Sequence, residues 1–230
     1  MATYVIATIK SWNIGNAKHF IERHPEHDWV LVTEKEELTK ENLEKINPKY
    51  VFLPHWSWII PSSVFGMFTC IVFHMTDLPY GRGGSPLQNL IVRGKMKTKI
   101  SAIQVADGID TGDVFMKEEL SLAGSATEIF NRFSDVVFTK MIPRFLEEDL
   151  QPVAQTGEVV AFARRKAKDG NIAGLVGVTK VYDYIRMLDA EGYPPAFIEN
   201  ESVKIEFKNA KLQESGKVTA TVIIKQKKYE

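Results

Sequence analysis

The chain has 230 residues, of which 44% are hydrophobic and 10% aromatic, as is typical of a globular protein with a well-filled core. Its 29 basic residues balance 29 acidic ones, which argues against a surface devoted to nucleic acid. The single cysteine, Cys70, excludes an intramolecular disulfide, and no apolar run approaches the roughly 20 residues that span a bilayer. We therefore expect a cytoplasmic protein with neither a membrane nor a nucleic acid as partner.

Short β-rich runs alternate with amphipathic runs along the first part of the chain. The predicted strands are residues 4–9, 29–33, 50–53, 70–73 and 99–105, and the predicted helices are residues 14–22, 38–46, 86–93 and 127–146. This alternation predicts an α/β fold with an open, mostly parallel sheet. Ligands bind such sheets at the carboxyl ends of the strands. The sequence contains neither G-x-G-x-x-G nor G-K-[ST], so it gives no sign of the usual dinucleotide or ATP site.

The composition changes after Pro152. A basic, polar connection covers residues 163–172, and a short helix is predicted over residues 182–188. Residues 203–207 and 218–225 then alternate like strands. We expect a first domain of residues 1–164 and a small β-rich subdomain of residues 165–230. An exposed apolar face on that subdomain could pair two copies of the chain, so a homodimer is possible.

Two motifs carry the candidate catalytic groups. F-H-M-T-D-L-P-Y-G-R-G-G-S-P begins at Phe73, and D-G-I-D-T-G-D begins at Asp107. His74 and Asp110 each follow a predicted strand, so we expect them to meet at the carboxyl ends of the strands. A histidine held against a carboxylate can move one proton during attack on a carbonyl group. Taken alone, His74 reads as a structural residue at a strand end, and Asp110 as a turn residue.

The two motifs together resemble those of the formyltransferases that use 10-formyltetrahydrofolate. The other residues that match are Leu78, Pro79, Arg82, Gly83, Pro86, Asp107, Gly108, Gly112 and Asp113. The resemblance implies a Rossmann-like formyltransferase sheet, 10-formyltetrahydrofolate as co-substrate and no metal. It also implies that His74 supplies a hydrogen bond to the developing oxyanion and carries the proton, while Asp110 orients the imidazole.

The resemblance also assigns residues to ligand binding. The residues expected to bind the folate are Leu53, His55, Trp56, Ile59, Leu78, Pro79, Asp107, Gly108 and Ile109. The residues expected to bind the acceptor are Met75, Thr76, Asp77, Arg82, Gly83 and Gly84. For Arg82, a salt bridge that fixes its own loop is an equal alternative, and Trp56 also fits a core or rim position.

One position departs from the family pattern. Family members usually carry an asparagine two positions before the histidine, where this chain has Val72. Either another group, such as Asn13 or a backbone N–H, supplies the missing hydrogen bond, or the oxyanion depends on His74 alone. The second case predicts slower catalysis.

The sequence favours a small-molecule amine as the acceptor. We expect transfer of the formyl group to a nucleotide-linked amino sugar. Formylation of an aminoacyl group on a carrier protein and a non-catalytic folate-binding protein are the alternatives. The short, neutral chain argues against the tRNA enzyme, and Val72 argues against the purine enzyme. The sequence does not identify the sugar, its nucleotide or the position of its amino group.

Overall fold

The computed structural model describes residues 1–227 and consists of two compact units. Unit 1 comprises Met1–Gly83, Thr98–Leu120 and Asn131–Ala161, and unit 2 comprises Gly84–Lys97, Ser121–Phe130 and Phe162–Glu230. The domain boundary expected at residue 165 stays a prediction. The last three residues of that predicted subdomain lie outside the described residues.

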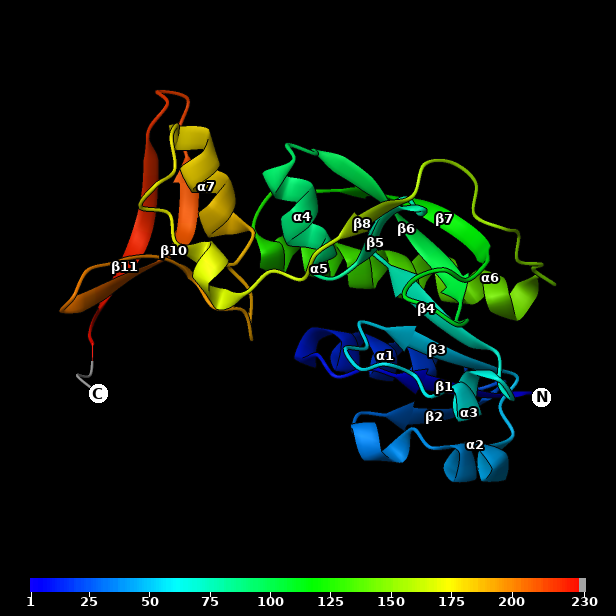
Figure 1. Cartoon of the computed structure of the whole chain (residues 1–230). Helices are drawn as coiled ribbons and strands as arrows, with labels where there is room; N and C mark the ends of the chain where they lie inside the picture. Colours follow the sequence, from blue (N-terminus) through cyan, green and yellow to red (C-terminus); the bar gives the residue numbers. More distant parts are fainter. Residues whose placement is uncertain (228–230) are drawn as a thin grey trace. The chain divides into compact units, whose positions relative to one another are not determined.

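A six-stranded sheet with the order β2-β1-β3-β4-β6-β7 forms the centre of unit 1 (Figure 1). Its strands are β1 (Thr3–Ala7), β2 (Asp28–Val32), β3 (Tyr50–Pro54), β4 (Cys70–His74), β6 (Lys97–Gln104) and β7 (Val114–Ser121). The four strands from β2 to β4 are parallel, which confirms the predicted mostly parallel α/β sheet. The exception is β6, which runs antiparallel to β4.

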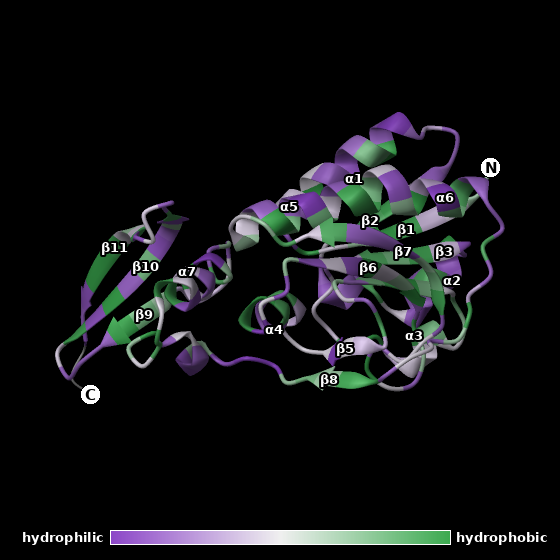
Figure 2. Ribbon diagram, turned by 90° about the horizontal axis from the view of Figure 1, so that it is seen from above, coloured by the Kyte–Doolittle hydropathy of each residue, from purple (hydrophilic) through white to green (hydrophobic). Residues whose placement is uncertain are grey.

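Helices cover both faces of this sheet. Val5, Val51 and Leu53 face α2 (Lys40–Ile46) and α3 (Ser62–Phe65) in one apolar cluster. On the other face, Phe52 lies 5.5 Å from Phe145 between ring centres. Alternate residues of a strand point to opposite faces, so strands buried on both sides read as continuous apolar runs. Hydrophilic and hydrophobic patches alternate along α1 (Ser11–Arg23), as expected of a helix with one buried side (Figure 2).

The predicted helix over residues 127–146 is divided into three consecutive helical segments. These are α5 (Ala126–Val136), a π-helical segment η2 (Val137–Met141) and α6 (Ile142–Glu147). Pro143 lies in the first turn of α6, and proline has no N–H to donate to the preceding turn. We attribute the wider π-helical turn just before it to this missing hydrogen bond.

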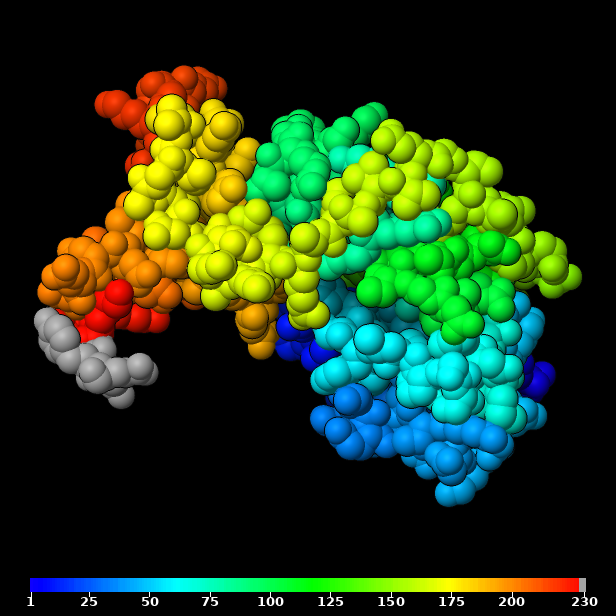
Figure 3. Space-filling model, viewed as in Figure 1, coloured from blue at the N-terminus to red at the C-terminus, as the bar shows by residue number. Residues whose placement is uncertain are grey.

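Two short strands were not predicted from the sequence. These are β5 (Tyr80–Gly83) and β8 (Val160–Phe162), which pair with each other. Residues 148–159 precede β8 and run over the surface (Figure 3). They are attached to β7 through Val153, which exchanges two backbone hydrogen bonds of 2.8 and 2.9 Å with Val114.

Unit 2 contains the small β-rich sheet that the sequence predicts. Its helical segments are the short η3 (Ala167–Gly170) and the longer α4 (Pro86–Val92) and α7 (Val178–Arg186). The strands β9 (Ala196–Glu199), β10 (Val203–Leu212) and β11 (Val218–Gln226) form an antiparallel sheet. Arg186 is buried and donates to the carbonyl oxygens of Leu122 and Gly124 at 2.7 and 2.8 Å.

Apolar side chains are exposed on the edge strand of that sheet. Val222 is 49% and Ile224 67% exposed on β11. The homodimer that this face suggested stays a prediction. Within residues 1–227, no helix is both long enough and apolar enough to cross a membrane.

Candidate active site

The structure brings His74 and Asp110 together. His74 is the last residue of β4 and is 8% exposed. Its Nδ1 atom lies 3.5 Å from Oδ2 of Asp110, which belongs to the loop between β6 and β7. An imidazole and a carboxylate in this arrangement can share the task of taking up and releasing one proton.

The route by which Asp110 reaches His74 differs from the prediction. Because β6 is antiparallel to β4, its last residue, Gln104, lies opposite Ile71, and His74 lies opposite Ser101. The loop that carries Asp110 therefore starts near the beginning of β4 and folds back towards its end. The expectation that two parallel strand ends deliver the pair is wrong, because alternating apolar residues identify a strand without giving its direction.

The imidazole of His74 is held from its other side by a backbone group. The Nε2 atom lies 2.8 Å from the carbonyl oxygen of Gly81. A carbonyl oxygen only accepts hydrogen bonds, so Nε2 carries the hydrogen in this contact. Nδ1, which faces Asp110, is then the ring nitrogen that is able to take up a proton.

The carboxylate of Asp110 is held by a backbone group at the end of β5. The N–H of Gly83 donates to Oδ2 of Asp110 at 2.8 Å. Asp110 itself has a φ of 54°, in the left-handed region that residues other than glycine rarely adopt. Gly112 stands so close to Gln104 that an added Cβ would lie 1.6 Å from its carbonyl oxygen. The loop therefore requires glycine at this position.

Arg82 contacts the catalytic loop through a residue that the sequence analysis did not single out. Its Nε and Nη2 atoms donate to Oε1 of Gln155 at 3.1 and 2.8 Å. Gln155 in turn donates from Nε2 to the carbonyl oxygens of Asp110 and Gly112 at 2.8 and 2.7 Å. The structure favours the loop-fixing alternative for Arg82, with an amide in place of the expected acid. No motif surrounds Gln155 in the sequence, so only the fold identifies it.

The other residues predicted to bind the acceptor are largely engaged within the protein. Met75 and Thr76 are buried, and the Thr76 hydroxyl donates to the carbonyl of Gly81 at 3.3 Å. Partial burial acts to raise the pKa of Asp77, but hydrogen bonds and charges from Lys117 and Lys99 hold that pKa below its usual value. The binding roles of these residues stay predictions.

Gly83 and Gly84 lie on either side of the division between the two units. The N–H of Gly84 donates to the carbonyl oxygen of Phe162 at 3.1 Å, and an added Cβ would lie 2.7 Å from Cβ of Arg164. Close backbone approach, which glycine permits, accounts for Gly84. Its predicted contact with the acceptor also stays a prediction.

The residues predicted to bind the folate differ in exposure. Leu53, Leu78 and Pro79 are buried, His55 and Trp56 are half-buried, and Asp107, Gly108, Ile59 and Ile109 are exposed. Ile59 is 87% and Ile109 66% exposed, and each belongs to a loop next to a strand of the sheet. The folate-binding roles of all these residues stay predictions.

The imidazole of His55 lies in an aromatic environment at the carboxyl end of β3. His55 follows β3 directly and has a φ of 58°. Its ring packs edge-on against Trp12 and Phe133, at 5.6 and 6.3 Å between centres. Burial of the imidazole, and secondarily the positive charge of Lys10, lowers the pKa of His55 to about 4. His55 is therefore neutral near pH 7.

Val72 presents an apolar side chain where the family pattern has an amide. It lies on the same side of β4 as His74 and packs against Leu78, Ile103 and Val114. Asn13, the side chain suggested as a substitute, is fully buried, and its Nδ2 donates to the carbonyl of Pro54 at 3.4 Å.

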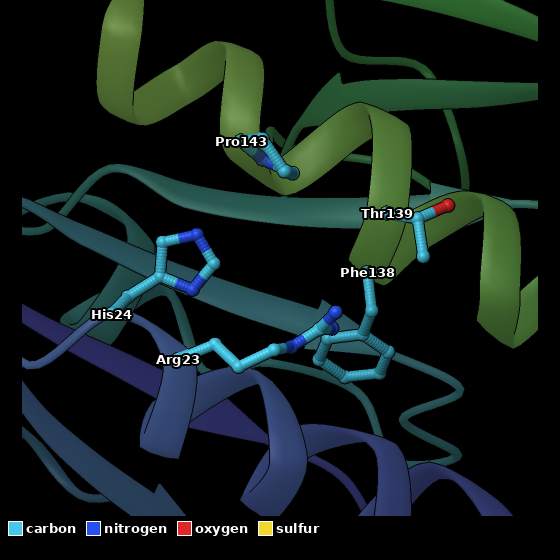
Figure 4. Close-up of a pocket in the computed structure, with 5 residues that line it drawn as sticks. All are labelled: Arg23, His24, Phe138, Thr139 and Pro143. Carbon is cyan, nitrogen blue, oxygen red and sulfur yellow. The ribbon is translucent and has the colours of Figure 1, made fainter.

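A shallow cavity of about 330 Å³ lies away from this chemistry. Arg23 and His24, at the end of α1, face Phe138, Thr139 and Pro143 (Figure 4). Since α1 starts beside the carboxyl ends of the strands and runs back along the sheet, its end lies remote from His74. Within the described part of the chain, no group of three or more potential metal-ligating His, Cys, Asp or Glu residues occurs.

Two family models match parts of this chain. The family model described as "Formyl transferase" matches residues 14–144. The chain belongs to the formyl transferase family. This membership confirms the predicted family, the formyltransferases. A second model, described as "Methionyl-tRNA formyltransferase, C-terminal domain", matches residues 167–225.

Individual relatives extend this result. A solved structure described as methionyl-tRNA formyltransferase from Clostridium thermocellum is 51% identical, with a TM-score of 0.96, over 99% of this chain and 100% of that one. The curated methionyl-tRNA formyltransferase of Wolinella succinogenes is 27% identical over 173 residues, which are 73% of this chain and 55% of the relative. The corresponding protein of Rickettsia felis is 28% identical over 55% of this chain and 44% of its own length. The chain thus spans about half the length of the curated relatives it matches.

Two predictions about the acceptor are wrong. The sequence analysis expected a nucleotide-linked amino sugar and no nucleic-acid partner, whereas the relatives just described are all named methionyl-tRNA formyltransferases. A solved sugar N-formyltransferase from Shewanella is 13% identical, with a TM-score of 0.66 over 96% of each chain. Similarity at that level shows a shared fold, but it does not indicate which acceptor this chain uses.

Proposed function

We propose that this chain transfers the formyl group of 10-formyltetrahydrofolate to the amino group of methionyl-tRNA. The observation that carries the proposal is the 51% identity to the Clostridium thermocellum protein over nearly the whole of both chains. The pairing of His74 with Asp110 supports it, because the same reaction needs a group that moves one proton. An enzyme acting on aminoacyl-tRNA would work in the cytoplasm.

The geometry suggests how the protein's own groups serve this reaction. The bound folate supplies the formyl group. Nδ1 of His74 accepts the proton that the attacking amine releases, while Nε2 keeps its hydrogen on the carbonyl of Gly81. The carboxylate of Asp110, 3.5 Å from Nδ1, stabilises the imidazolium that results. The same Nδ1 then returns the proton to the departing nitrogen. Proton transfer of this kind contributes about 10²–10⁴-fold to the rate.

The neutral composition does not count against this acceptor. Net charge is a sum over the whole chain, whereas contact with phosphates requires only a local excess of positive charge. Arg164, Arg165, Lys166 and Lys168 occur within five consecutive positions of unit 2, and all but the half-buried Arg165 are exposed. This run is a suitable contact for tRNA phosphates.

The test is a formylation assay with purified protein, 10-formyltetrahydrofolate and methionyl-tRNA. Formylmethionine would be released from the tRNA by mild base and measured by mass spectrometry. We expect product with the wild type and with His24→Ala, a control in the remote cavity, and a large loss with His74→Ala. Absence of product with the folded wild type, or undiminished product with His74→Ala, would contradict the proposal.

A further inference from the structure

The segment of residues 153–160 crosses the surface of unit 1 and is attached at three places. At one end, Val153 exchanges two backbone hydrogen bonds with Val114, which lies just after the loop that carries Asp110. At the other end, the N–H of Val160 donates to the carbonyl of Pro79 at 3.3 Å, next to Leu78. Between these ends, Gln155 provides the third attachment.

Gln155 uses both ends of its side-chain amide. Nε2 donates to the carbonyl oxygens of Asp110 and Gly112 at 2.8 and 2.7 Å. Oε1 accepts two hydrogen bonds from the guanidinium of Arg82 at 3.1 and 2.8 Å. Carbonyl oxygens only accept and a guanidinium only donates, so the amide has a single orientation that satisfies all four contacts.

We infer that Gln155 is a positioning residue of the formyl-transfer site. Its amide fixes the backbone on both sides of Thr111 and thereby directs the carboxylate of Asp110 towards Nδ1 of His74. Arg82 contributes by holding the amide in that orientation. The inference rests on the proposed function only for its kinetic consequences, because the contacts themselves concern the free protein.

The backbone of Asp110 explains why such a support is needed. Its φ of 54° is unfavourable for a residue with a side chain, and its neighbours Asp107, Gly108 and Ile109 are exposed. The side-chain contact with the Gly83 N–H holds only the carboxylate. The hydrogen bonds from Gln155 hold the peptide groups on both sides of Thr111. The position of the Asp110 peptide group sets the direction in which the Asp110 side chain points.

Replacing Gln155 tests the role of its amide. Gln155→Met keeps the length of the side chain and removes all four hydrogen bonds. We expect kcat to fall by about 10–100-fold, since small displacements of a reacting group have effects of this size, while KM stays near the wild-type value. Gln155→Glu still accepts from Arg82 but cannot donate to the loop, and should be equally impaired. Gln151→Met, an exposed control on the same connection, should behave like the wild type. Wild-type kcat in either Gln155 variant would overturn the inference.

A double-variant comparison separates positioning from general stability. If Gln155 acts through the carboxylate, Gln155→Met should lower kcat in the wild type and have no further effect when Asp110 is already alanine. A purely structural role would lower kcat by the same factor in both backgrounds, and that result would overturn the inference.

The ring nitrogens of His74 provide a readout that needs no acceptor. In NMR spectra of ¹⁵N-histidine-labelled protein, we expect Gln155→Met to move the His74 signals towards their positions in Asp110→Ala. The other histidines, such as His24, report whether the fold is intact. Unchanged His74 signals in folded Gln155→Met would overturn the inference. If the wild type formylates no tRNA, the proposed function fails, and these spectra still decide the role of Gln155.

Discussion

Replacing Val72 with asparagine should make the enzyme faster and less stable. Val72 precedes His74 by two positions and lies on the same side of β4, so an amide there points towards the same end of the strand. A donor directed at a developing oxyanion is worth about 3–4 kcal/mol when it is fully preorganised. An amide introduced without its supporting neighbours should supply less, and we expect a rise in kcat of about 10-fold, or about 1.4 kcal/mol.

The cost in stability follows from the surroundings of the side chain. Val72 packs against Leu78, Ile103 and Val114, and an amide placed among apolar groups costs about 1–3 kcal/mol in proteins. Urea unfolding would measure that cost, and rapid-quench formylation of saturating methionyl-tRNA would measure kcat. Val72→Thr is the matched control, because it is polar and β-branched but its hydroxyl does not extend as far. A folded Val72→Asn enzyme no faster than Val72→Thr would refute the reasoning.

Three further changes have defined consequences. Lys166→Glu together with Lys168→Glu should raise KM for tRNA and weaken its dependence on salt concentration, because phosphate contacts release counterions; an unchanged salt dependence would exclude these lysines from the interface. Gly112→Ala should destabilise the protein by about 1–3 kcal/mol, as overpacking does, since the added Cβ meets the Gln104 carbonyl at 1.6 Å; urea unfolding would detect this, and wild-type stability would contradict it. Because the fold favours neutral His55, with a pKa of about 4 against 6.5, the free energy of unfolding should fall as the pH drops from about 6.5 towards 4. His55→Asn should show a weaker pH dependence, and an identical profile would refute this assignment.

Much of the catalytic unit could be predicted from the sequence. Continuous apolar runs identify β1, β3 and β4, because strands buried on both faces need no polar alternation. By contrast, β7 was missed. Val114, Met116 and Leu120 are buried, but Lys117, Glu118 and Glu119 interrupt the pattern with charges. The direction of a strand cannot be predicted from its apolar pattern either. The path of the Asp110 loop, which depends on β6 running antiparallel to β4, is therefore known only from the structure.

The candidate site shows a similar division. His74 and Asp110 stand out because motifs surround them, whereas Gln155 lies 45 positions after Asp110 in an exposed, irregular segment. Its role depends on four hydrogen bonds that exist only in the folded protein. The acceptor was predicted wrongly because net charge was treated as if it described a local surface. The basic residues from Arg164 to Lys168 provide such a local surface, although their polar composition alone predicts only a connection.

Single-turnover formylation of methionyl-tRNA tests the central claim most directly. The wild type would be compared with Asp110→Asn and His74→Gln, with binding of the folate measured separately for each protein. The account predicts that both variants bind the folate and lose at least about 10² in rate, the lower limit for a lost proton-transfer group. A variant that keeps the wild-type rate, or a wild type that leaves methionyl-tRNA unmodified, would contradict it.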